Sequence, residues 1–146
     1  MAKLAHVSRP SYRAALLSIV LALATLTGPI HVTDGDTIRA GPERIRLLGI
    51  DAPDGPSNGR CRPYSKPGAA CDKARSGAAT RSLRAAITRR MEIERVGRDR
   101  YGRTLALVLS SKGNLSCWQL RRGMAVYEAK WDNRHRIGQA CPKAAR

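Results

Sequence analysis

The order of strands and helices predicted from the sequence favours an α+β domain that is mainly β, with a five-stranded barrel and two or three helices. Three observations lead to this fold class. Short apolar runs broken by Gly- and Pro-containing turns come first, one long helical segment follows a loop, and two further strands precede a short helix. The length of 146 residues suits a single domain.

The first three strands are predicted from short runs next to turn residues. Ile30–Thr33 and Thr37–Ala40 flank the turn at residues 34–36, and a Gly-Pro turn leads into Arg44–Ile50. In the last run apolar side chains alternate with Arg44 and Arg46, which is typical of a half-buried strand.

A loop rich in Pro and Gly, over residues 52–70, separates these strands from the remaining elements. The tail from Asp132 onward is polar and basic. After the loop we predict a helix, two strands and a short helix, over Cys71–Arg90, Met91–Val96, Thr104–Ser110 and Leu115–Arg122. The five predicted strands and this placement of helices fit a barrel of the oligonucleotide-binding (OB) type.

The charge balance indicates a polyanionic partner. The chain has 27 Lys and Arg against 11 Asp and Glu, a formal net charge of +16, and 21 of the basic residues are Arg. Arg binds phosphate through a planar fork of donors, although a codon bias toward Arg is an alternative explanation. With 42% hydrophobic and 26% charged residues, the chain is neither a disordered polycation nor a multi-span membrane protein.

The N-terminus has the pattern of a secretory signal. Residues 1–13 carry three basic side chains and no acid, residues 14–26 are almost entirely apolar, and Ala24 ends a small-residue motif. We therefore expect a signal peptide over residues 1–24, a domain over residues 25–146, and a secreted or periplasmic protein. An uncleaved N-terminal anchor and a buried core helix are alternatives, although the apolar run is shorter than the roughly 20 residues that span a bilayer.

Export bears on the four cysteines. An even number in a small exported chain favours two disulfides, for which three connectivities exist. Sequence separation favours Cys61 with Cys71 and Cys117 with Cys141. A zinc site is disfavoured because no Cys-x-x-Cys or paired Cys/His spacing is present.

Four aspartates lie close together in a chain that has few acids. Asp34 and Asp36 belong to the first turn, and Asp51 and Asp54 follow the third strand. If these strand ends are neighbours, the carboxylates converge and repel one another unless a cation lies among them. A hard divalent ion with oxygen ligands meets that requirement.

Two arginines extend this pattern toward phosphodiester chemistry. Arg46 lies on the strand that leads to Asp51, and Arg103 ends a later basic hairpin. A metal held by carboxylates beside two guanidinium groups can neutralise the charge of a phosphoryl transition state while a further carboxylate orients water. In the alternative interpretation, the aspartates are turn and cap residues with surface arginine partners.

Three blocks of the sequence resemble the staphylococcal-nuclease (thermonuclease) family: Val32–Thr37, Ile45–Asp54 and Asp99–Ala106. They occur in the family's order and at near-family spacing, and the resemblance covers residues 30–131. It implies a Ca²⁺-dependent phosphodiesterase on an OB barrel. Such enzymes cut DNA and RNA at the 5′-oxygen and leave 3′-phosphates.

The resemblance assigns metal-binding roles position by position. Asp36 and Asp51 match the family's calcium carboxylates, and Ala52 matches the residue that gives the metal its backbone carbonyl. Asp34 matches an acid that acts near the metal through water. These residues are the expected metal site.

The resemblance assigns the substrate and catalytic roles to the other blocks. Arg46 and Arg103 match the two phosphate-binding arginines, the second of them near the leaving oxygen. Arg100 and Tyr101 match positions that contact a terminal phosphate. Asp54 occupies the general-base position.

Two departures from the family pattern affect these roles. The family usually has Glu at position 54, and the Asp here is shorter by one methylene, or about 1.5 Å. Because a misplacement of about 1 Å can cost around a hundredfold in rate, weak activity is one expected result. The family often has a pair of pocket aromatics after Gly123, and Tyr127 and Trp131 either stack on a base or belong to the core.

Other functions fit the sequence less well. The main alternative is a noncatalytic OB module that only binds nucleic acid, but the strand blocks contain few aromatic platforms. A membrane-active cationic protein leaves the aspartates unexplained. His31 and His135 do not suit a two-histidine ribonuclease, and no serine-hydrolase or Walker motif is present. We expect a monomer acting on single-stranded or locally open DNA and RNA, with no stable membrane partner once the signal peptide is cleaved.

Overall fold

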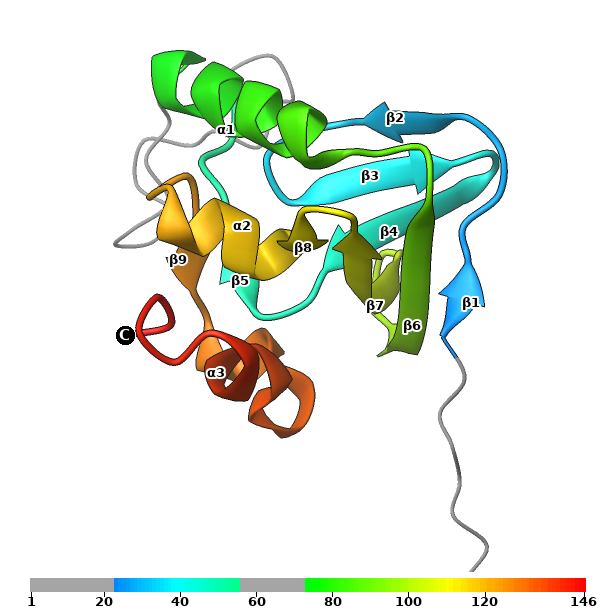
Figure 1. Ribbon diagram of the computed structural model, residues 1–146. Helices are drawn as coiled ribbons and strands as arrows, with labels where there is room; N and C mark the ends of the chain where they lie inside the picture. Colours follow the sequence, from blue (N-terminus) through cyan, green and yellow to red (C-terminus); the bar gives the residue numbers. More distant parts are fainter. Residues whose placement is uncertain (1–22, 56–72) are drawn as a thin grey trace, which may run out of the picture.

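A computed structural model describes residues 23–55 and 73–146 of the chain. The fold is mainly β, with a curled sheet and three α-helices, as predicted (Figure 1). Cys61, Cys71 and most of the expected signal lie outside the described residues. Within the described part, no helix is both long and apolar enough to cross a membrane.

The main sheet has the strand order β1-β6-β7-β4-β3-β2, and β8 pairs with β7. Its pairs are antiparallel except β4 with β7, which run parallel. A second, two-stranded sheet joins β5 (Ile50–Asp51) to β9 (Val126–Tyr127). The strands of the main sheet are β1 (Ala24–Thr25), β2 (Ile30–Val32), β3 (Thr37–Ala40), β4 (Glu43–Leu47), β6 (Met91–Arg98), β7 (Thr104–Ser110) and β8 (Gly113–Asn114).

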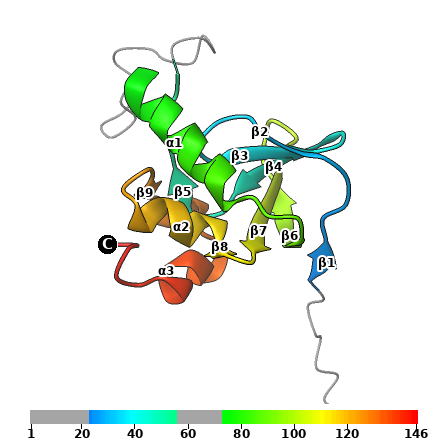
Figure 2. The same ribbon diagram turned by 45° about the horizontal axis from the view of Figure 1, so that its top comes forward.

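The helices cover one side and one end of the curled sheet (Figures 1 and 2). Helix α1 (Lys73–Ala86) buries Ala79, Leu83 and Ala86 at helical spacing, and it packs against α2 (Leu115–Arg121). Asn114 caps α2, since its side-chain oxygen accepts the backbone N–H of Cys117. A short C-terminal helix, α3 (Arg136–Ala140), follows two 3₁₀ turns at Ala129–Trp131 and Asn133–His135.

The predicted strand Arg44–Ile50 is wrong beyond Leu47. Leu47 and Leu48 are both buried, which breaks the alternation, and Gly49 adopts φ +70°, a conformation that turns the backbone out of the strand. The chain resumes as β5, which pairs with β9 and not with the main sheet. A Cβ atom at position 49 would lie 3.0 Å from the Ile137 side chain, so the sharp turn and the tight packing both require glycine.

The other predicted elements differ mainly at their ends. The helix predicted to reach Arg90 ends at Ala86, and the strand predicted to end at Val96 continues to Arg98. The expected boundary between signal and domain falls inside β1, where Ala24 pairs with Ile93.

The C-terminal segment packs more closely than its polar composition indicates. Ile137 is fully buried. The buried carboxylate of Asp132 accepts the backbone N–H groups of Ile137 and Gly138 and the hydroxyl of Tyr127. A disulfide joins Cys117 in α2 to Cys141, which ties this segment to the body of the domain.

Candidate active site

The turn between β2 and β3 carries the first two aspartates. The backbone N–H of Asp36 donates to Asp34 Oδ1 at 3.2 Å, and Thr33 donates its backbone N–H to the Thr37 carbonyl at 2.9 Å. Gly35 is buried at the centre of this turn. A Cβ atom there would lie 2.6 Å from the Cβ atoms of Ala52 and Ala79, so only glycine lets the turn lie this close to the end of β5 and to α1.

Asp36 is held by three donors and is only 5% exposed. Its Oδ1 accepts the Thr37 hydroxyl and an Arg46 Nη1–H, both at 2.8 Å. Its Oδ2 accepts the backbone N–H of Ala52 at 3.0 Å. The turn is thereby fixed to both β4 and the end of β5, two elements that follow it in sequence.

Arg46 lies between two aspartates. Its Nη1 contacts Asp36, and its Nη2 donates to Asp51 Oδ1 and to the Ile50 carbonyl, each at 3.1 Å. The guanidinium also lies over the ring of Trp131, 4.9 Å from its centre. These bonds use three of the five N–H donors of Arg46, so Nε–H and one Nη1–H remain for a further acceptor.

The cluster carries more negative charge than Arg46 neutralises. Burial, together with the charge of Asp36, raises the pKa of Asp34 to about 7. Burial and Asp36 likewise raise the pKa of Asp51, against the opposing effect of Arg46. For Arg46, burial would lower the pKa, but Asp36 and Asp51 outweigh it and raise the pKa above its usual value.

Arg103 is positioned by Asp99 within the β6–β7 hairpin. Asp99 Oδ2 accepts Arg103 Nε–H at 2.7 Å, and its Oδ1 accepts the backbone N–H groups of Tyr101 and Arg103. Burial alone would raise the Asp99 pKa, but these hydrogen bonds lower it overall. The guanidinium of Arg103 also lies 5.4 Å from the centre of the Tyr101 ring. Its two Nη groups have no hydrogen-bond partner among the described residues and are not fully buried, which leaves a fork of donors available.

The parallel pairing of β4 and β7 brings the two arginines to one face. Ile45 pairs with Thr104 and Leu47 with Ala106, and all four side chains are buried. Because side chains alternate along a strand, Arg46 and Arg103 both point away from this core. They reach the same outer face of the sheet from positions far apart in the sequence.

The remaining predicted site residues take different places. Trp131 lies beside Arg46, whereas Tyr127 donates its hydroxyl to Asp132 at 2.8 Å and packs against the C-terminal segment. Asp54 lies near enough to raise the pKa of Asp51 slightly. Arg100 lies over the exposed ring of Tyr101, at the tip of the hairpin.

A known protein family matches most of the chain. A family model described as "staphylococcal nuclease homologue" matches residues 44–146. The chain belongs to the staphylococcal nuclease homologue family. No curated protein matches the chain. The matched range includes Arg46, Asp51 and Arg103, and it begins after the turn that carries Asp34 and Asp36.

The donor set of this nuclease homologue suits a hard divalent cation, since carboxylate and carbonyl oxygens are the ligands that Ca²⁺ prefers. Burial, and then the charge of Asp36, raise the pKa of Asp34 and Asp51, so a cation beside them would favour their ionised forms. In residues 23–55 and 73–146, however, no three His, Cys, Asp or Glu side chains are grouped as ligands. The Arg46 guanidinium, and not a set of converging oxygens, joins Asp36 to Asp51.

The roles of three supporting residues were not identified from the sequence. Thr37 donates to Asp36, and Asp99 orients Arg103. Gln119, fully buried in α2, donates from Nε2 to the Gly35 carbonyl at 2.7 Å and to the Ala79 carbonyl at 2.9 Å. The four-residue spacing of Asp99 and Arg103 was a usable signal, whereas nothing in the sequence links Gln119 to Gly35.

We predict that Gln119→Leu destabilises the domain by about 2 kcal/mol or more, because it removes two buried hydrogen bonds, to the carbonyl groups of Gly35 and Ala79. Urea unfolding followed by tryptophan fluorescence measures this effect. The matched control is Gln139→Leu, the same substitution at an exposed position in α3, with an expected change within about 0.5 kcal/mol. Equal stabilities of the two variants would show that Gln119 does not support the turn.

We also predict that Asp34 makes stability fall as pH rises. Its pKa is about 7 in the folded state against a usual value of 3.8, so the folded state binds the proton more tightly. Relative to Asp34→Asn, which does not titrate, the wild type should lose at most about 4 kcal/mol between pH ~4 and pH ~7 and change little outside that window. Unfolding free energies in chelator, measured across this range, test the prediction. A wild type that gains stability with pH relative to the variant would contradict it.

Proposed function

We propose that this member of the family is a calcium-dependent nuclease that hydrolyses phosphodiester bonds of DNA and RNA and leaves 3′-phosphates. The observation that carries the proposal is a pair of arginines on one sheet face, Arg103 buried and Arg46 largely buried, with unused N–H donors beside a cluster of aspartates. Family membership supports a nucleic-acid partner in general.

In the proposed mechanism, the arginines bind the phosphodiester and Asp54 activates water. The Nη groups of Arg103 and the remaining donors of Arg46 hydrogen-bond the non-bridging oxygens, whose charge grows in the transition state. Asp54 accepts a proton as the water oxygen forms its bond to phosphorus. The bond from phosphorus to the 5′-oxygen then breaks, and the 5′-oxygen accepts a hydrogen bond from Arg103 and takes its proton from solvent.

Asp36, Asp51 and the Ala52 carbonyl would hold the calcium ion, with Asp34 near it. Bound there, Ca²⁺ supplies positive charge that stabilises the phosphoryl transition state. While the arginines bind the phosphate, Asp36 and Asp51 must keep their orientation. The Thr37 hydroxyl and the Ala52 N–H hold Asp36 independently of Arg46.

The proposal extends to where the protein acts. The basic and apolar N-terminal segment supports export through a cleaved signal, to the periplasm or the medium. The disulfide between Cys117 and Cys141 suits an oxidising compartment.

We predict that the oxidised domain cuts single-stranded DNA and RNA in Ca²⁺ and not in chelator. Arg103→Gln and Asp36→Asn should each lower kcat by about 10²–10³, since each removes a group that acts on the transition state or orients one that does. A gel assay with end-labelled substrate measures the rate, and the labelled ends identify the 3′-phosphate. Salt-sensitive binding without any Ca²⁺-dependent cleavage would reject the enzyme and favour a module that only binds nucleic acid.

Two controls sharpen this test. His135→Ala changes an exposed residue with no place in the mechanism and should leave the rate unchanged. Asp54→Glu restores the acid usual in the family. If the shorter side chain limits the reaction, this variant should be faster than the wild type by up to about a hundredfold. An unchanged rate would show that the length of this side chain is not limiting.

A further inference from the structure

A row of basic residues crosses the outer face of the sheet beside the candidate active site. His31 in β2 pairs with Arg39 in β3, and Arg39 pairs with Arg44 in β4. Their neighbours Ile38 and Ile45 are fully buried, so the three basic side chains point to the outer face. We call His31, Arg39 and Arg44 the basic row.

The basic row leads to the arginines of the site. Ile45 pairs with Thr104 in the parallel ladder, which places Arg44 next to Arg103 in register. Arg44 also lies two residues before Arg46 on the same face of β4. The distance from His31, at one end of the basic row, to Arg103 beyond its other end is roughly 14 Å, because the path crosses from β2 to β3, β4 and β7 and neighbouring strands lie about 4.8 Å apart. That length equals the rise of about four stacked nucleotides at about 3.4 Å each.

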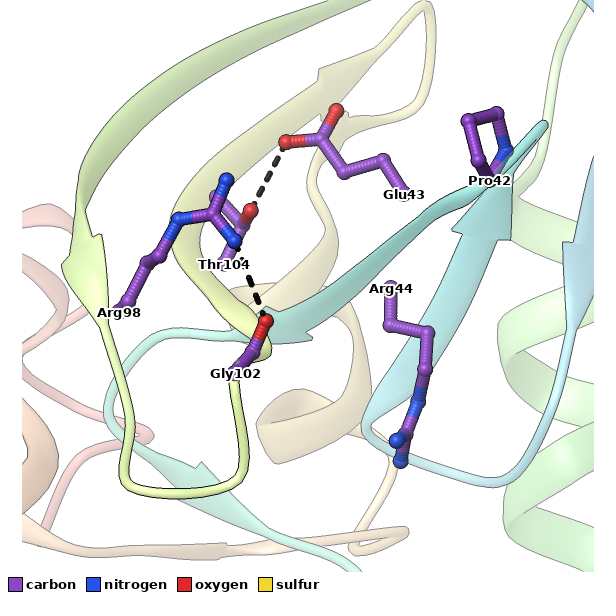
Figure 3. A pocket seen from close by; sticks show the side chains of 6 residues that line it. All are labelled: Pro42, Glu43, Arg44, Arg98, Gly102 and Thr104. Carbon is purple, nitrogen blue, oxygen red and sulfur yellow. Dashed lines mark hydrogen bonds between the residues drawn. The ribbon is translucent and has the colours of Figure 1, made fainter.

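A hollow of about 330 Å³ lies between this end of the row and the β6–β7 hairpin. Figure 3 shows Arg44 from β4 and Arg98 from the hairpin among the residues that line it. Glu43 also lines the hollow, but its carboxylate accepts hydrogen bonds from Thr104 and Arg95 (Figure 3 shows the first of these bonds). Its negative charge is therefore already paired with a cation.

The direct pairing of Arg39 with Arg44 is unfavourable for the protein alone. Residues opposite one another in an antiparallel pair have Cβ atoms about 5 Å apart, and like charges there are destabilising. Among the described residues, no carboxylate forms an ion pair with either arginine. A polyanion bound across the two strands would remove this repulsion.

We propose that the basic row binds the phosphate backbone of a nucleic-acid strand next to the cleaved bond, with Arg39 and Arg44 each contacting a phosphate. This inference rests on the proposed nuclease function, since the row ends at Arg46 and Arg103. It adds a second region of contact, so that a long strand binds more tightly than a dinucleotide.

The test compares Arg39→Gln/Arg44→Gln with a matched control, Arg81→Gln/Arg84→Gln. The control removes the same charge from exposed positions of α1, which contributes no residue to the row. Fluorescence anisotropy in chelator, where the proposed enzyme does not cut, measures binding of a single-stranded oligonucleotide of about 20 nucleotides as a function of salt.

Loss of two phosphate contacts should reduce the slope of log K against log salt by about 1.4 and weaken binding about 25-fold at 0.1 M salt. The unfolding midpoint in urea should not fall, because the substitution removes a like-charge pair. In Ca²⁺, KM should rise for the oligonucleotide, whereas kcat/KM for a dinucleotide should stay that of the wild type.

Other results would overturn the inference. A salt slope equal to that of the control variant would show that the row does not contact phosphates, and so would a wild type that fails to bind the oligonucleotide. An equal loss of dinucleotide cleavage would place the two arginines at the cleaved bond instead. If the salt slopes of the wild type and Arg39→Gln/Arg44→Gln differ as predicted but the wild type never cuts in Ca²⁺, the proposed nuclease function is wrong and the binding role of the basic row is supported.

Discussion

The site depends on one interaction: the largely buried guanidinium of Arg46 is held between Asp36 and Asp51. It joins a turn, a strand and a strand end that the chain supplies in succession, and it does so where water is largely excluded. A buried charge left without its partner is strongly destabilising, so the two aspartates and the arginine must be present together. The stability of this part of the domain and its chemistry therefore rest on the same three side chains.

The surroundings of this interaction are built to keep it in place. Gly35 lets the turn approach Ala52 and Ala79, and Gln119 fastens the turn to α1 and α2 through two buried hydrogen bonds. On the other side of the site, Asp99 fixes one edge of the Arg103 guanidinium and leaves the other edge open. Rigid support of this kind positions charged groups before a ligand arrives, which is where much of an enzyme's electrostatic stabilisation originates.

The sequence predicted the structure correctly where residues close together along the chain determine it. Alternation and turn residues predicted β3 and β7 correctly. The sequence placed Asp36 and Asp51 at strand ends whose carboxylates converge if the ends are neighbours, but it did not show that Arg46 would join them. The departure of the chain from β4 at Gly49 was missed, because it depends on packing against Ile137, far along the sequence. The role of Gln119 was missed for the same reason, since its side-chain amide donates to backbone carbonyl groups far away in the sequence, which no side-chain pattern reveals.

Among the described strands of the main sheet, only β4 and β7 pair in parallel, and the arrangement of the two site arginines depends on this pairing. Parallel strands cannot be joined by a tight turn, so Arg46 and Arg103 share a face only through a contact between segments far apart in the sequence. Such non-local contacts carry a loop-closure cost. A chain that has formed only its first hairpins has the aspartates but not the face that Arg46 and Arg103 share, so the proposed phosphate-binding face needs the pairing of β4 with β7.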